Sequence, residues 1–96
     1  MRLGINFEAV KGLTDAEYIK TISDLGFSAT FTDMTQTKNV LEIAELCQSH
    51  GIVYETIHAP LINVNSIWQD GINGDEVLKI MTDCVNTCST AKVPYI

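Results

Sequence analysis

The sequence predicts an α/β fold in which parallel strands alternate with helices, as in part of a (β/α)8 barrel. Short apolar segments alternate with segments whose apolar residues recur at helical spacing, in the order β-α-β-α-β-α-β. Most connections are short, which indicates parallel neighbours joined by right-handed crossovers. An open doubly wound sheet shares this order, but neither a GxGxxG motif nor a Walker loop follows the first strand. The sequence therefore favours the barrel over an open nucleotide-binding sheet.

The first strand and helix follow from local patterns. Alternation predicts a buried strand at Arg2–Phe7. Thr14 and Glu17 match the capping box, in which the Thr hydroxyl accepts a hydrogen bond from the Glu amide while the Glu carboxylate reaches back to the cap amide. We therefore expect a helix at Asp15–Leu25, followed by Gly26, the residue type favoured in a left-handed C-terminal cap.

The middle of the chain repeats this strand–helix unit. Phe27–Phe31 is the second predicted strand. A second helix is expected after Thr37, which suits an N-cap, and it ends at Gly51. Ile52–Ile57 is the third predicted strand, because it is rich in β-branched and aromatic residues.

The last part of the chain opens with a long loop from His58 to about Gly74. Loops of this length in compact domains are usually functional or mobile. A third helix is expected at Asp75–Thr90, and Val93–Ile96 begins a fourth strand. One apolar stripe runs along this helix, formed by Val77, Leu78, Met81, Cys84, Val85 and Cys88.

Length, charge and cysteine content exclude several classes of protein. The 96 residues suit one domain, and a net charge of −6 with well-spread basic residues argues against nucleic-acid and membrane partners. The N-terminus lacks a signal-peptide pattern, and the longest uncharged run, Thr56–Gln69, is too short to span a bilayer. Three cysteines, Cys47, Cys84 and Cys88, are expected as free thiols in the cytoplasm. Cys84 and Cys88 fit small core residues better than a metal-binding pair.

Polar side chains follow each of the first three predicted strands. Glu8 follows the first, Asp33 the second and His58 the third. Reactive groups in parallel α/β folds collect at these carboxyl ends. The two carboxylates suit one of three roles: hydrogen bonding to a polyol, binding of a metal ion, or simple solvation in a loop. The imidazole suits metal ligation, proton transfer or the ordering of its loop.

Alternation along the third strand predicts which of its side chains share a face. His58 is expected on one face with Thr56 and Tyr54, and Glu55 on the other with Ile57. Glu55 is then either a carboxylate on the sheet or barrel interior, or one partner of an ion pair.

The long loop and the end of the second helix supply further polar and aromatic groups. Trp68 suits stacking on the apolar face of a sugar or capping a pocket, and equally a loop anchor packed on a helix. Asn63 and Asn65 suit turns better than hydrogen bonds to substrate hydroxyls. His50 complements the dipole at its helix end, and we assign it no chemistry.

Four sequence features, taken in order, resemble the sugar phosphate isomerase/epimerase family, whose relatives include xylose isomerase and endonuclease IV. They are the opening LGIN run, the DLGF turn at Asp24–Phe27, the segment from His58-Ala59-Pro60 through Asn65 and Trp68 to Glu76, and the closing VPY. The resemblance covers residues 1–96. It implies the N-terminal three and a half βα units of a xylose isomerase-like (β/α)8 barrel.

The resemblance also implies an activity and a set of site residues. The family interconverts or epimerises sugars or sugar phosphates in carbohydrate metabolism, with a divalent Zn, Mn or Mg ion. Glu8, His58, Asn65 and Trp68 match the substrate pocket. In the endonuclease branch His58 matches a zinc ligand, whereas in the epimerase branch the metal ligands lie on later strands.

Because the chain stops in its fourth predicted strand, those later metal ligands and proton-transfer groups are absent from it. We therefore expect a truncated, catalytically inactive portion of such an enzyme that binds no metal by itself, with no catalytic residue assigned. One alternative is a half-barrel module without catalysis that self-associates through its open sheet edges. Another is a small flavodoxin-like binding or signalling protein.

Overall fold

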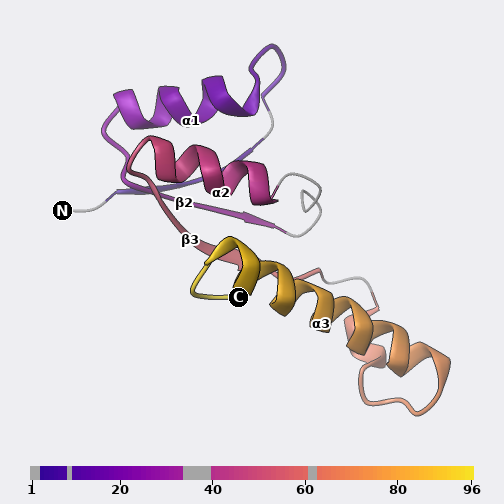
Figure 1. Ribbon diagram of the computed structural model, residues 1–96. Coiled ribbons are helices and arrows are strands. Elements are labelled where there is room, and N and C mark those ends of the chain that lie inside the picture. Colours follow the sequence, from indigo (N-terminus) through magenta and orange to yellow (C-terminus); the bar gives the residue numbers. More distant parts are fainter. Residues whose placement is uncertain (1–2, 9, 34–39, 61–62) are drawn as a thin grey trace.

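The computed structural model describes residues 3–8, 10–33, 40–60 and 63–96, and it confirms an α/β fold (Figure 1). Three parallel strands pair in the order β1-β2-β3. The strands are β1 (Gly4–Asn6), β2 (Ala29–Asp33) and β3 (Val53–His58). The helices are α1 (Asp15–Asp24), α2 (Val40–Ser49) and α3 (Ile72–Ala91), with a short 3-10 helix, η2 (Val64–Ser66), before α3.

Several boundaries differ from the sequence-based prediction. Strand β2 begins two residues later than expected, and the predicted fourth strand is reduced to one parallel bridge, between Thr56 and Tyr95. Helix α3 begins three residues earlier than Asp75. Its first turn includes Asn73 and Gly74, which the sequence placed in the long loop, because the amide of Asp75 already bonds the carbonyl of Gly71 at 3.0 Å. The expected cap Thr37 lies outside the described residues.

The predicted capping box of α1 is confirmed. The amide of Glu17 donates to Thr14 Oγ1 at 3.1 Å, and the amide of Thr14 donates to Glu17 Oε1 at 3.4 Å. Gly26 adopts a positive φ of 94°, which is the left-handed conformation expected after the helix. These contacts are local in sequence, which is why the sequence pattern predicts them.

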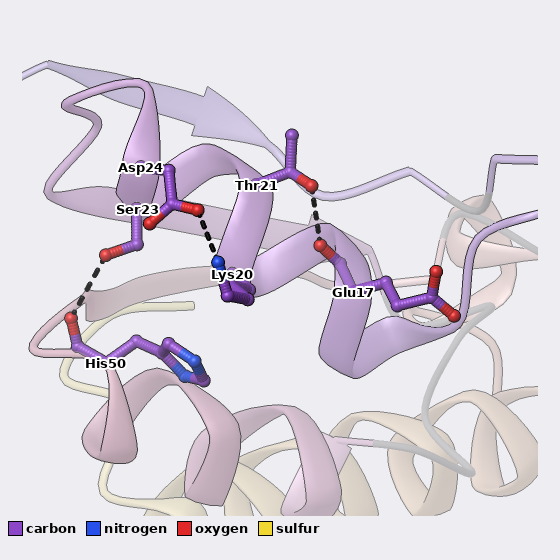
Figure 2. Close-up of polar contacts among 6 residues, drawn as sticks. All are labelled: Glu17, Lys20, Thr21, Ser23, Asp24 and His50. Carbon is purple, nitrogen blue, oxygen red and sulfur yellow. Dashed lines mark hydrogen bonds and ion pairs between the residues drawn. The ribbon is translucent and has the colours of Figure 1, made fainter.

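Helices α1 and α2 pack against each other, and a hydrogen bond joins their ends. Figure 2 shows the hydroxyl of Ser23 donating to the carbonyl of His50 at 3.4 Å. The His50 ring bonds its own helix, with Nδ1 3.0 Å from the carbonyl oxygen of Leu46, in agreement with a helix-end role. The Lys20–Asp24 ion pair in the same view is exposed, so it contributes little to stability.

All three helices contribute to a single core on one face of the sheet. Its buried members are Phe7, Ile19, Ile22, Val40, Ile43, Cys47, Ile52, Tyr54, Ile57, Cys84, Cys88 and Val93. Two buried threonines of β2 lie among them and are paired: Thr30 Oγ1 donates to the carbonyl of Ile5 at 2.7 Å, and Thr32 Oγ1 lies 2.5 Å from Tyr54 Oη. Pairing removes most of the cost of burying these hydroxyls.

A register shift in β3 overturns the predicted alternation. Thr30 pairs with Tyr54 but Phe31 pairs with Thr56, so Glu55 is an extra, bulged residue. Tyr54 and Ile57 are therefore both buried in the core face, although strict alternation placed them on opposite faces. His58 shares the opposite face with Thr56, as predicted, but not with Tyr54.

The second face of the sheet is uncovered by the described residues. Phe31 and Val53 are 40% and 42% exposed there, and Tyr95, next to Thr56, is 66% exposed. Helix α3 extends beyond the sheet (Figure 1), which gives the molecule extents of 49 × 27 × 21 Å. Its predicted apolar stripe is only half covered, since Val77, Cys84 and Cys88 are buried but Leu78 and Val85 are exposed. Among the helices of the described residues, none is both long and apolar enough to cross a membrane.

Candidate functional site

The carboxyl edge of the sheet brings together the three strand-end residues predicted from the sequence. Asp33 and His58 are register partners at the ends of β2 and β3. Their side chains point to the uncovered face, because each lies two residues after Phe31 or Thr56 on that face. Neighbouring strands lie about 4.8 Å apart, so the two side chains leave the sheet from adjacent positions.

Glu8 lies at the same edge, just beyond β1. Asn6 is the register partner of Phe31, and the amide of Phe7 continues the pairing by donating to the carbonyl of Phe31 at 2.8 Å. Glu8 therefore leaves the sheet beside the end of β2. Its Oε1 accepts a hydrogen bond from Asn6 Nδ2 at 3.1 Å. The sequence reasoning did not assign this role to Asn6, although the two-residue spacing that places both side chains on one face is visible in the sequence.

The ring of His58 is oriented by its own loop. Nδ1 lies 2.8 Å from the carbonyl oxygen of Ala59. Because a carbonyl can only accept, Nδ1 carries the hydrogen, and the neutral ring has its lone pair on Nε2. The exposed His58 side chain can therefore offer Nε2 to a hydroxyl, a proton or a metal ion.

The other two predicted pocket residues lie away from this edge. Asn65 is exposed in η2, and residues 63–71 lie beside the first turns of α3, at the end of the molecule farthest from the helix-covered sheet (Figure 1). Trp68 is 78% exposed, so it is not the packed loop anchor that was one of its two interpretations. Asn63 adopts a left-handed φ of 55° and its carbonyl accepts from the amide of Ser66 at 2.8 Å, which agrees with a turn.

The three cysteines are core residues rather than reactive groups. All are buried and free. Burial raises the pKa of the Cys47 and Cys84 thiols to about 11, and it also raises the pKa of Cys88. Because the thiolate is the nucleophile and the metal ligand, these protonated thiols are poor candidates for either role at neutral pH.

The described residues do not by themselves form a metal site. Within residues 3–8, 10–33, 40–60 and 63–96, no three His, Cys, Asp or Glu side chains lie close enough together to hold a metal ion. Asp33 and His58 are a neighbouring pair, whereas protein metal sites usually need three or four ligands. A metal ion at this edge would need further ligands.

A groove lies at the other end of β3. It has a volume of about 650 Å³ and is lined by α2, the start of β3 and the end of α3. Ile52, Val53 and Tyr54 line it, whereas none of Glu8, Asp33 and His58 does. Reactive groups in parallel α/β folds lie at the carboxyl ends of the strands. We therefore place the candidate site at Glu8, Asp33 and His58 and not in this groove.

Comparison with known proteins gives no match. No protein-family model, no curated protein and no solved structure matches the chain.

Proposed function

We propose that the chain contributes the first βα units of a (β/α)8 barrel that isomerises or epimerises a sugar or sugar phosphate. One observation carries this proposal: Glu8 follows β1 while Asp33 and His58 end β2 and β3, all at one edge of the parallel sheet. Two carboxylates and an imidazole with an accepting Nε2 suit a ligand rich in hydroxyl groups. The sequence resemblance to the sugar phosphate isomerase/epimerase family points to the same substrate class.

The winding of the sheet supports a barrel. The order β1-β2-β3, followed by the bridge from Thr56 to Tyr95, advances in one direction. All three helices contribute to one core on one face. A doubly wound sheet reverses direction and has helices on both faces, whereas a barrel keeps every helix outside. The uncovered face with Phe31 and Val53 then corresponds to a barrel interior, which matches the tendency of parallel sheets to be buried on both faces.

The proposed chemistry is proton transfer between neighbouring carbon atoms of the sugar. The family's chemistry runs through an enediol intermediate or a hydride shift. The enediol route needs a group that removes a proton and returns it, and imidazole and carboxylate groups do this near neutral pH. We assign hydrogen bonding to substrate hydroxyls to Glu8 and Asp33, and proton transfer or hydroxyl binding to His58. The resemblance also implies a divalent metal ion, which would supply polarisation of the substrate oxygens. The described residues alone do not complete its coordination.

Replacement of His58 tests the function. In the protein made from the complete reading frame that contains these residues, we expect His58→Ala to lower kcat/KM for aldose–ketose interconversion by about 10²-fold or more, the scale of one general acid–base group. His50→Ala is the matched control, because the His50 ring bonds its own helix end, at the carbonyl of Leu46, and lies away from the candidate site. Assays with neutral sugars and with sugar phosphates give the preferred substrate. Equal activity of the two variants, or no interconversion by the unmodified protein, contradicts the proposal.

Self-association is a second candidate function, favoured by the uncovered sheet face. Phe31, Val53 and Tyr95 expose apolar surface where parallel sheets are normally covered. In this case the 96-residue chain is a binding or structural module. Light scattering after size exclusion is then expected to give twice the 10.6 kDa chain mass.

The substitution Phe31→Glu is expected to convert such a dimer to a monomer, because it places a charge in the interface. Leu25→Glu is the control, since Leu25 is 70% exposed at the end of α1, away from this face. A wild-type monomer that melts cooperatively would rule out this candidate.

A further inference from the structure

Tyr18 ties the first turns of α1 to the end of β1. Its hydroxyl donates to the carbonyl of Asn6 at 2.7 Å. Its ring meets Phe7 edge-on, with 4.8 Å between ring centroids and 65° between planes. Phe7 is buried in the core, and the capping box of Thr14 and Glu17 fixes the helix turn from which Tyr18 projects. Both ends of this contact are therefore anchored.

Asn6 joins that anchored backbone to the candidate site. Its carbonyl accepts from Tyr18, while its side-chain amide donates to Glu8 Oε1 at 3.1 Å. Glu8 itself has left the strand, so no ladder hydrogen bond of β1 determines the place of its carboxylate. In the part of the chain that the structure describes, the Asn6 amide is the hydrogen-bond donor to Glu8 Oε1, and the second carboxylate oxygen can accept from a ligand.

We infer that Tyr18 and Asn6 are positioning residues that hold the Glu8 carboxylate at the carboxyl edge for a hydroxyl group of the substrate. The inference rests on the proposed sugar-binding function. Tyr18 orients the Asn6 backbone, Asn6 orients one oxygen of Glu8, and the other oxygen accepts from the sugar. The partner of this oxygen is a hydroxyl donor, because an ionised carboxylate oxygen only accepts hydrogen bonds.

Two single variants and their combination test this relay of hydrogen bonds from Tyr18 through Asn6 to Glu8. Tyr18→Phe removes the hydroxyl and keeps the ring contact, whereas Asn6→Ala removes the amide. Each is expected to weaken binding of D-fructose about fivefold, which corresponds to one hydrogen bond of about 1 kcal/mol. The double variant should be no weaker than Asn6→Ala alone, because both changes release the same carboxylate. Fully additive losses would overturn the inference.

A spectroscopic readout separates this inference from the proposed function. In NMR spectra of the unliganded 96-residue chain, Tyr18→Phe is expected to shift the side-chain amide signals of Asn6 and the carboxyl ¹³C signal of Glu8. The control is Thr21→Val, which removes another hydroxyl of α1, bonded to the Glu17 carbonyl at 2.7 Å (Figure 2). Unchanged Asn6 and Glu8 signals in Tyr18→Phe overturn the relay. Shifted signals without any fructose binding keep the relay and reject the sugar ligand.

Discussion

Ile57→Ala is expected to destabilise the chain strongly, whereas deletion of Glu55 is expected to leave it folded. Glu55 is the extra residue of β3, and it allows Tyr54 and Ile57 to face the same core. Without it, these two side chains stand two positions apart, so regular alternation keeps both in the core and the pairs Phe31–Thr56 and Thr32–Ile57 persist. Ile57 is fully buried, and loss of such a side chain from a core costs about 2–5 kcal/mol. The total stability of a small domain is only about 5–15 kcal/mol.

Urea and thermal unfolding followed by circular dichroism measure this effect. Glu55→Ala is the control, because it keeps the residue count and changes only an exposed side chain. Its free energy of unfolding should remain within about 0.5 kcal/mol of the parent value. If the deletion variant loses its cooperative melt, or melts no higher than Ile57→Ala, β3 does not keep its register with β2 once the bulged residue is removed.

Gly74→Ala is expected to destabilise the chain, although alanine is normally the better helix residue. A Cβ at Gly74 would lie 1.8 Å from the carbonyl oxygen of Gln69 and 3.3 Å from that of Ser66. Both are backbone atoms, so the loop before α3 must move. Overpacking of this kind costs about 1–3 kcal/mol, which exceeds the gain of about 1 kcal/mol in helix propensity. We therefore expect a lower midpoint of thermal unfolding.

The fluorescence of Trp68 reports on the same change, because it is the single tryptophan of the chain and belongs to the displaced loop. Asn73→Ala is the matched control at the neighbouring, exposed position of the same helix turn. A melting temperature that rises in Gly74→Ala, as it does for an ordinary exposed helical glycine, contradicts the close approach of the loop.

The parts of the fold that depend on local contacts are predicted well from the sequence. The capping box of Thr14 and Glu17 spans three residues, and its pattern is sufficient to locate α1. The placement of Glu8, Asp33 and His58 at one edge follows from the order of strands and helices alone. Their assigned chemistry remains a prediction.

The features that depend on pairing between distant segments are not predictable in this way. The bulge at Glu55 arises from how β3 pairs with β2, and no local pattern indicates it. The contact from Tyr18 to Asn6 spans twelve residues and needs the packing of α1 on the strand end. The exposure of Leu78 and Val85 on α3 also depends on what packs beside the helix, whereas periodicity predicts only that they share a stripe.

The buried thiols can report how often the helices that carry them open locally. A protonated, inaccessible sulfur reacts with iodoacetamide only when its helix leaves the core, so the alkylation rate measures how often this opening occurs. Cys47 reports on α2, and Cys84 and Cys88 report on α3. Peptide mass spectrometry can resolve the two helices in one sample. It then shows whether the long α3, which extends beyond the sheet, opens independently of the body formed by α1 and α2.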